Sequence, residues 1–239
     1  WRRYFELATR DSAESEHLLL LAQVIAQIIR LHEVQGVPVQ DALDSYLVFY
    51  TQPWEFLGVG ADTSRQDTKQ RGEILEDVNV LLPLVLFGVE PVDPKYDILF
   101  GGGRVSSMLL GTFALCNVDV CYDCPYNALI EKKWGSLSAE AVGIFSRIPE
   151  VTKDSPGWLP KFYGTALYRT ASMCNHSCSP NLEIEYHENN KIVGRSVRRL
   201  SEGDELTISY IDQSQTFSER SQELYDRYSF RCRCAKCRV

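Results

Sequence analysis

The eight residues CNHSCSPN at positions 174–181 are the most informative part of this chain, because no ordinary structural need selects that combination of side chains. Two later stretches accompany them. ELTISY at 205–210 has the pattern of a strand that ends in tyrosine, and YSFRCRCAKC at 228–237 places three cysteines within six residues. The three stretches are therefore interpreted together.

The cysteine usage favours a metal site over disulfides. The chain has eight cysteines and no recognisable signal peptide, and Cys232, Cys234 and Cys237 form a Cys-x-Cys-x-x-Cys run. Such crowding is typical of metal ligands rather than of a secreted disulfide framework. We therefore expect a reducing compartment, the nucleus or the cytoplasm. A structural zinc ion takes four ligands, so a fourth side chain must join the run.

In this order the stretches resemble three signatures of SET-domain protein lysine methyltransferases: the Asn-His-Ser-Cys-x-Pro-Asn motif, a strand ending in the catalytic tyrosine, and a zinc-binding segment after the SET domain. GTALY at 164–168 and the spacing of the last cysteines look most like the SET and MYND group. The resemblance is specific over residues 163–239. It implies an α+β fold with a β-rich core, knot-like threading of the 205–210 strand with the Asn175 segment, a large α-helical insertion and a zinc-bound tail.

The resemblance also implies a division of the chain. Residues 1–110 form the helical insertion region, 111–212 the C-terminal part of the SET core with an inserted loop, and 213–239 the post-SET zinc segment. The chain begins with Trp1 rather than Met and is interpreted as a fragment. The family's first SET segment, with its glycine-rich turn, and its MYND zinc finger are expected upstream.

The resemblance assigns a role to each of ten residues. The reaction transfers a methyl group from S-adenosylmethionine to a lysine amine, which must lose its proton from an ordinary pKa of ~10.4. Positioning and exclusion of water are expected to supply much of the catalysis. The implied catalytic residues are Tyr210 and Tyr228; the cofactor contacts are Asn175, His176, Tyr210, Phe230 and Asn117; and the zinc ligands are Cys178, Cys232, Cys234 and Cys237.

Two alternative metal assignments remain open. Cys174 competes with Cys178 as the fourth ligand. Cys116, Cys121 and Cys124 have a spacing that suits a second zinc ion, but they supply only three thiols and a structural site takes four. Buried or free thiols are the simpler interpretation of these three residues.

Charge and hydropathy restrict the class of partner. The net charge of −7 argues against general nucleic-acid binding, which depends on neutralising phosphates with Lys and Arg. A lysine-containing protein substrate, either a histone tail or a non-histone protein, suits an acidic enzyme better. No apolar run reaches the roughly 18 residues of a membrane span, so no membrane partner is expected.

Two other functions were considered. A SET-like scaffold that has lost activity and serves as a protein-interaction module is the principal alternative. Retention of Tyr210, Asn175 and His176 argues against it, and the absence of the glycine-rich turn argues for it. A zinc-dependent nucleic-acid binder is disfavoured by the acidic charge.

Periodicity predicts the remaining elements. Apolar residues recur at helical spacing over 14–34, 39–50 and 71–87, with a kink or an end at Pro83. The glycines at 101–103 predict a flexible turn before a helix over the apolar run 105–113, and residues 127–160 read as helix and loop. A hairpin of strands 182–186 and 191–199, a strand over 205–210 and a helix over 218–227 complete the prediction.

Overall fold

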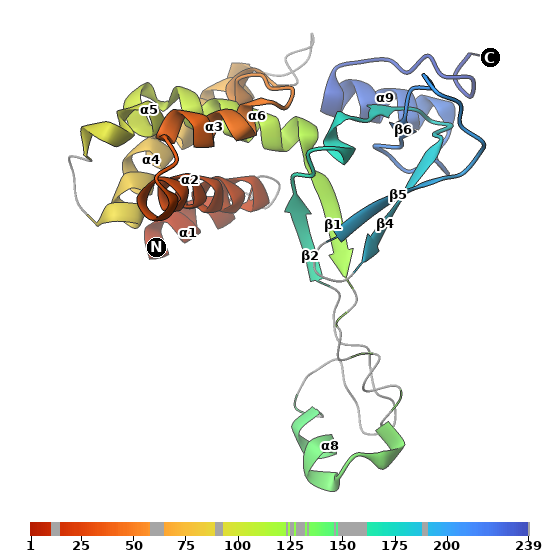
Figure 1. The fold of residues 1–239 in the computed structure, drawn as a ribbon, viewed down its shortest axis with the longest axis horizontal. Coiled ribbons are helices and arrows are strands. Elements are labelled where there is room, and N and C mark those ends of the chain that lie inside the picture. Colours follow the sequence, from red (N-terminus) through yellow and green to blue (C-terminus); the bar gives the residue numbers. More distant parts are fainter. Residues whose placement is uncertain are drawn as a thin grey trace. The chain divides into compact units, whose positions relative to one another are not determined.

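The structure is a computed structural model that describes residues 1–10, 15–57, 65–88, 93–122, 124, 127, 132, 134–145, 147, 162–187 and 191–238. The chain forms two compact units (Figure 1). The first comprises Trp1–Val118, Leu167–Glu185 and Ile192–Val239, and the second comprises Asp119–Ala166 and Tyr186–Lys191. The three-part division made from the sequence stays a prediction.

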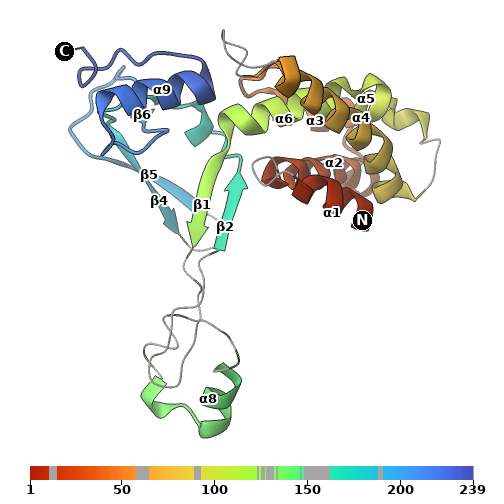
Figure 2. The same cartoon turned by 180° about the vertical axis from the view of Figure 1, so that it is seen from behind.

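The N-terminal part of the first unit is helical. Its helices pack against one another, as seen from both sides in Figures 1 and 2. The α-helices are α1 (Arg2–Arg10), α2 (Ser15–Gln35), α3 (Val39–Leu47), α4 (Arg65–Phe87), α5 (Asp97–Phe100) and α6 (Arg104–Cys116). Short 3₁₀ turns are η1 (Trp54–Phe56), η2 (Pro94–Tyr96) and η3 (Gly101–Gly103).

Four predicted helices are confirmed, with bounds that differ from the prediction. Helix α4 begins six residues before the predicted start and continues through Pro83 instead of ending there. Helix α1 was not predicted, although Tyr4, Leu7 and Ala8 lie on one buried face of it. The Tyr4 hydroxyl donates a hydrogen bond to the Leu18 carbonyl at 2.7 Å, which ties α1 to α2.

Helix α6 is the central element of this helical core. It packs against α2, α3, α4, α5 and η1, and Leu109, Leu110 and Phe113 on it are fully buried. Gly102 and Gly103, before its first turn, have φ of 73° and 71°, a conformation that glycine adopts without strain. The predicted turn before a helix is therefore confirmed.

Gly111 allows a loop to lie directly on α6. A Cβ atom at this position would stand 1.7 Å from the Gln52 carbonyl oxygen. The same loop is held by a hydrogen bond from the Thr51 hydroxyl to the Met108 carbonyl at 2.7 Å and one from the Cys116 thiol to the Tyr50 carbonyl at 3.2 Å. The loop between α3 and η1 therefore requires glycine here.

Replacing Gly111 with alanine is expected to lower the free energy of unfolding by about 1–3 kcal/mol, because the new methyl group must displace backbone. Gly72 in α4 is the matched control, since a Cβ there meets nothing within 4 Å. Gly72→Ala should be neutral or stabilise by about 0.5–1 kcal/mol. Urea denaturation of both variants measures the difference, and equal stabilities would contradict the close-approach argument.

By length and hydropathy alone, two helical stretches are able to cross a membrane: Glu16–Gln35, with a mean hydropathy of 1.3, and Pro94–Cys116, with 1.4. Polar residues interrupt both, which is why no continuous apolar run was found. Both place side chains in the helical core, and the core helix of a soluble protein passes the same test. The finding is weak evidence, and the absence of a membrane partner stays a prediction.

The strands form three two-stranded sheets, β1 with β2, β3 with β6 and β4 with β5. Their bounds are β1 (Val118–Tyr122), β2 (Phe162–Ala166), β3 (Asn175–His176), β4 (Leu182–His187), β5 (Lys191–Ser196) and β6 (Thr207–Ile208). The predicted hairpin is confirmed as β4 and β5, and its turn at 188–190 lies outside the described residues. Helix α8 (Ala139–Phe145) and turn η4 (Trp134–Ser136) belong to the second unit, and much of 127–160 also lies outside the description.

Strand β6 is shorter than predicted because side chains take its backbone groups. The Glu205 carbonyl accepts from the Asn181 amide at 2.8 Å, and the Tyr210 N–H donates to His176 Nδ1 at 3.0 Å. Only Thr207 and Ile208 remain in the ladder, paired in parallel with β3. Parallel pairing requires a long connection, here residues 177–206. Threading of these segments through one another stays a prediction.

Candidate functional site

The four predicted metal ligands lie together. The sulfur atoms of Cys178, Cys232, Cys234 and Cys237 are all within 4.8 Å of one another, and the Cys178 and Cys237 sulfurs are 3.6 Å apart. Four thiolates around zinc, with Zn–S bonds of about 2.3 Å, stand about 3.8 Å from one another in a tetrahedron. The four sulfur atoms therefore fit a zinc ion if their separations change by about 1 Å or less.

Two segments bring these cysteines together. Cys178 follows strand β3 and is 1% exposed. The other three follow helix α9 (Phe217–Tyr228), which begins with a capping box between Thr216 and Glu219. Ser229 ends it at φ 57° and ψ 30°, which turns the chain toward Cys232. The predicted helix over 218–227 is thus confirmed, and it positions the tail. Turn η5 (Ala171–Met173) precedes the signature.

The alternative ligands lie elsewhere. The Cys174 sulfur is not part of the four-sulfur group and contacts the Thr170 carbonyl at 3.8 Å. The Cys116 thiol donates to the Tyr50 carbonyl, and burial raises its pKa to about 11. Cys124 is buried, and the side chain of Cys121 lies outside the described residues. A second zinc site on these cysteines stays an untested alternative.

The metal-free thiols differ in their affinity for protons. Burial raises the pKa of Cys178 to about 12, in spite of a hydrogen bond from Arg220 that lowers it. Burial also opposes ionisation of Cys234, but hydrogen bonds from Cys232 and Cys237 outweigh it and lower the pKa to about 6. Since only thiolates bind zinc, metal binding at neutral pH must release protons, above all from Cys178.

Four aromatic rings form a cluster beside the cysteines. The His176 ring centroid is 5.3 Å from that of Tyr210 and 5.9 Å from that of Phe230. Tyr210 and Tyr228 are 5.0 Å apart, and Tyr228 and Phe230 are 6.3 Å apart. The structure thus brings together four of the six predicted catalytic and cofactor residues. All four rings lie within the separations at which aromatic pairs attract one another.

His176 connects the aromatic cluster to the metal site. Its Nδ1 accepts the Tyr210 backbone N–H, so Nδ1 carries no proton and the proton of the neutral ring is on Nε2. Nε2 lies 3.2 Å from the Cys178 sulfur, to which it donates. Burial, with a smaller contribution from Arg220, lowers the pKa of His176 to about 4. The ring is therefore neutral at pH 7.

Tyr210 is held as a protonated phenol. Its hydroxyl donates to the Cys174 carbonyl at 2.6 Å. Burial, together with the neighbouring Tyr228, raises its pKa to about 12. The hydroxyl hydrogen is thus engaged, and the oxygen lone pairs remain to accept a hydrogen bond from an amine.

A cavity of about 470 Å³ lies against this cluster. Its volume is in the range of small-molecule sites. Asn175, His176, Tyr210 and Phe230 line it, as do two of the predicted zinc ligands, Cys232 and Cys234. The other lining residues are Ser177, Glu205, Thr207, Arg231 and Arg233. One wall of the cavity is therefore built from the cysteine cluster.

Asn175 and Asn117 differ in their relation to this cavity. The Asn175 amide lines it and donates to the Glu205 carboxylate at 2.6 Å. The Asn117 amide lies 3.4 Å from His17 Nε2, and Asn117 is not among the residues lining the cavity. Its assignment as a cofactor contact stays a prediction.

Asn181 holds strand β6 in place, a role that the sequence did not indicate. It is 3% exposed, and its Oδ1 accepts the Thr207 N–H while its Nδ2 donates to the Glu205 carbonyl, both at 2.8 Å. Its own N–H donates to the Thr207 hydroxyl at 3.3 Å. The last residue of the 174–181 motif thus supplies the bonds that a longer strand would make.

Replacing Asn181 with alanine is expected to lower the free energy of unfolding by about 2–4 kcal/mol, because two backbone groups lose their buried partners. Asn175→Ala is the control, and its exposed amide should change the unfolding free energy by less than about 1 kcal/mol. Urea denaturation monitored by far-ultraviolet circular dichroism measures both. A loss at Asn181 no larger than the control would contradict the assigned role.

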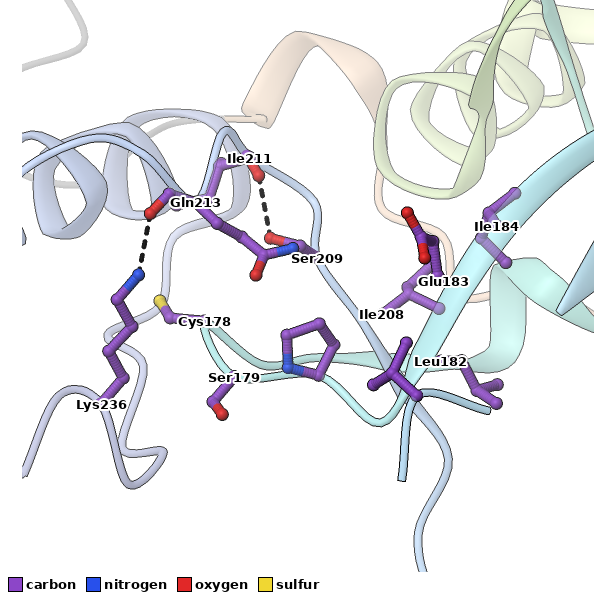
Figure 3. A pocket seen from close by; sticks show the side chains of 12 residues that line it. Cys178, Ser179, Leu182, Glu183, Ile184, Ile208, Ser209, Ile211, Gln213 and Lys236 are labelled. Atoms are coloured by element: carbon purple, nitrogen blue, oxygen red, sulfur yellow. Dashed lines mark hydrogen bonds between the residues drawn. The ribbon is translucent and has the colours of Figure 1, made fainter. Parts of the chain in front are cut away.

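A second cavity, of about 620 Å³, lies beside Cys178 (Figure 3). Its apolar lining comes mainly from Leu182, Ile184, Ile208 and Ile211. At its rim the Lys236 ammonium donates to the Gln213 carbonyl at 2.8 Å. Apart from Cys178, a predicted zinc ligand, none of the residues that line it has a role assigned from the sequence.

Comparisons with known proteins agree with the sequence motifs. The family model described as "SET domain" matches residues 39–211. "Histone-lysine N-methyltransferase SMYD3" of Mus musculus is 41% identical over 76 residues, 32% of this chain and 18% of that protein. "Histone-lysine N-methyltransferase ATXR2" of Arabidopsis thaliana is 42% identical over 77 residues, 31% of this chain and 16% of that protein.

A zebrafish relative is similar over about the same share of this chain. "N-lysine methyltransferase SMYD2-B" of Danio rerio is 39% identical over 74 residues, 31% of this chain and 17% of that protein. In each of these three cases the similarity spans less than a fifth of the relative's own length.

Proposed function

The chain belongs to the SET domain family, and from this membership we propose that it is a protein-lysine N-methyltransferase that uses S-adenosylmethionine. The similarity to SET and MYND proteins supports the narrower assignment. The observation that carries the proposal is the cavity lined by Asn175, His176, Tyr210 and Phe230 beside the four cysteines.

S-adenosylmethionine supplies an electrophilic methyl group on a sulfonium. Asn175, His176 and Phe230 line the cavity that would hold this cofactor. Glu205 contributes a carboxylate to the lining, and Arg231 and Arg233 contribute cations. The cofactor carries both a carboxylate and a positive sulfonium, so both signs of charge are suited to it.

The chain's residues prepare the lysine amine rather than react with it. Removing a lysine side chain from water favours its neutral form, and the rings of Tyr228 and Phe230 supply apolar surface for this. The Tyr210 oxygen then accepts a hydrogen bond from the amine and fixes its direction of approach. In this proposal Tyr210 is the orienting catalytic residue and Tyr228 lines the lysine channel.

The zinc ligands that line the cavity connect metal binding to cofactor binding. Zinc on Cys178, Cys232, Cys234 and Cys237 supplies the cross-link that fixes the tail after α9. With the tail fixed, Phe230 and the two lining cysteines complete the cavity wall. A histone tail or a non-histone protein is the proposed substrate, in the nucleus or the cytoplasm, without nucleic acid as a direct partner.

The test is transfer of a deuterated methyl group from labelled S-adenosylmethionine to core histones, followed by mass spectrometry of the lysine-containing peptides. The zinc-loaded protein is expected to label lysine, and Asn175→Ala is expected to abolish labelling at low cofactor concentration. If the protein binds zinc and histones but never labels lysine, at any cofactor concentration, the inactive-scaffold alternative replaces this proposal.

A further inference from the structure

Helix α9 buries an arginine. Arg220 is 4% exposed and is the one charged residue in the buried class among the residues that the structure describes. It shares a face of α9 with Leu224, which is 0% exposed and packs against Cys178 and Ile211. Its burial was not predicted, because one arginine in a charged amphipathic helix is ordinarily on the solvated face.

The polar contacts of Arg220 do not balance its charge. Its Nη1 donates to the Gln215 carbonyl at 2.6 Å, and its Nε has no hydrogen-bond partner. Leu224, one turn along the same face of α9, is buried in a cluster with Cys178, and Cys232, Cys234 and Cys237 pack against that cluster. The face of the helix that carries this buried cation is therefore the face that packs on the predicted metal ligands.

A buried cation without an anion is unfavourable, because the charge loses its hydration and gains no compensating attraction. Four thiolates around one Zn²⁺ carry a net charge of about −2, and burying part of that charge is also unfavourable. The guanidinium of Arg220 and the four cysteines lie next to each other in this fold. Each charge removes part of the cost of the other, and most fully when the metal is bound and all four thiols are ionised.

We propose that Arg220 is the counter-charge of the zinc site, a positioning residue that stabilises the zinc-loaded tetrathiolate by donating to the sulfurs of Cys178 and Cys237. In this arrangement Cys178 receives two donors, Arg220 and the neutral Nε2–H of His176, whose nitrogen lies 3.2 Å from the sulfur. The inference concerns zinc binding, and none of its tests uses methyl transfer, so it fails or stands independently of the proposed function.

The nearby exposed cations do not have this role. Arg227 lies on the same helix with its side chain 52% exposed and pairs with the Glu223 carboxylate at 3.2 Å. Its charge is solvated and already balanced. It is therefore a matched control for a general effect of positive charge on α9.

The experiment measures the zinc dissociation constant by chelator competition at one pH for the wild type, Arg220→Met, Arg220→Lys and Arg227→Met. Arg220→Met keeps the length and apolar stem of the side chain and removes its charge. We expect zinc to bind about 10–100-fold more weakly, the usual range for groups that hydrogen-bond to metal ligands. Arg220→Lys should recover part of the affinity, and Arg227→Met should stay within about threefold of the wild type, as expected of a solvated charge.

Thermal denaturation without zinc separates this role from a packing role. Removing an unpaired buried cation should leave the metal-free protein as stable as the wild type or more stable. The increase in Tm on adding zinc should be smaller for Arg220→Met. The proposal is overturned if the zinc dissociation constant of Arg220→Met is within threefold of the wild type. It is also overturned if this variant is equally destabilised with and without zinc, or fails to fold in saturating zinc.

Discussion

Tyr210→Phe is expected to lower kcat for lysine methylation by about 10²–10³-fold, the range for removing one preorganised polar group from an active site. The cofactor dissociation constant should change by less than about threefold, since the ring and its contacts with His176 and Tyr228 remain. The lost hydrogen bond to the Cys174 carbonyl costs about 0.5–1.5 kcal/mol of stability, too little to unfold the protein. The measurement is steady-state labelling of core histones alongside cofactor titration.

Tyr225→Phe is the control for this prediction. Tyr225 lies on α9 outside the ring cluster, where its ring stacks with the Arg231 guanidinium at 5.5 Å. Removing its hydroxyl should leave kcat within about twofold, as expected of a group that touches neither substrate nor cofactor. Equal losses of kcat and of cofactor affinity in Tyr210→Phe would remove the orienting role and leave Tyr210 as a residue of the cavity wall.

Cys178→Ala is expected to abolish stoichiometric zinc binding and to release the tail after α9. Structural zinc sites contribute about 10–16 kcal/mol of binding free energy in zinc-finger peptides, and that energy is available for folding. The amides of residues 230–238 should lose protection against hydrogen exchange, and Tm should fall on the order of 10 °C if several kcal/mol are lost. Metal content by mass spectrometry and hydrogen exchange measure the two effects.

Cys174→Ala is the matched control, because Cys174 is buried four residues earlier and is not part of the four-sulfur group. It should retain one zinc ion per chain, with a loss of stability of about 1 kcal/mol or less for a small buried side chain. If Cys174→Ala loses zinc and Cys178→Ala keeps it, the alternative ligand is the correct one.

The sequence predicted well those features that depend on local hydrophobic periodicity, on turn residues or on the spacing of cysteines. Helix α2, the β4–β5 hairpin and helix α9 follow from periodicity and turn residues, and the cysteine spacing of the tail indicates a metal site. Cys178 was identified only through the family motif, because nothing in its own neighbourhood shows that 54 residues later the chain returns to it. The family resemblance thus identified the long-range contact of Cys178 with the tail cysteines, which composition alone does not indicate.

The features that were missed depend on side chains that replace backbone bonds or on burial. The strand over 205–210 is shorter than its apolar pattern predicts, because Asn181 and His176 take the bonds at its two ends. Arg220 is buried on the face of α9 that packs against the cysteine cluster, a position that no helical pattern reveals. Helix α4 does not end at Pro83, and a kink at this residue stays a prediction.

The decisive measurement is isothermal titration of S-adenosylmethionine into the zinc-loaded protein, with Asn175→Ala and Tyr210→Phe titrated in parallel. We expect one binding site, which is retained in Tyr210→Phe and lost or weakened at least tenfold in Asn175→Ala. Absence of binding by the folded, zinc-loaded wild-type protein, or binding that is unaffected by Asn175→Ala, would contradict the assignment of this cavity to the cofactor.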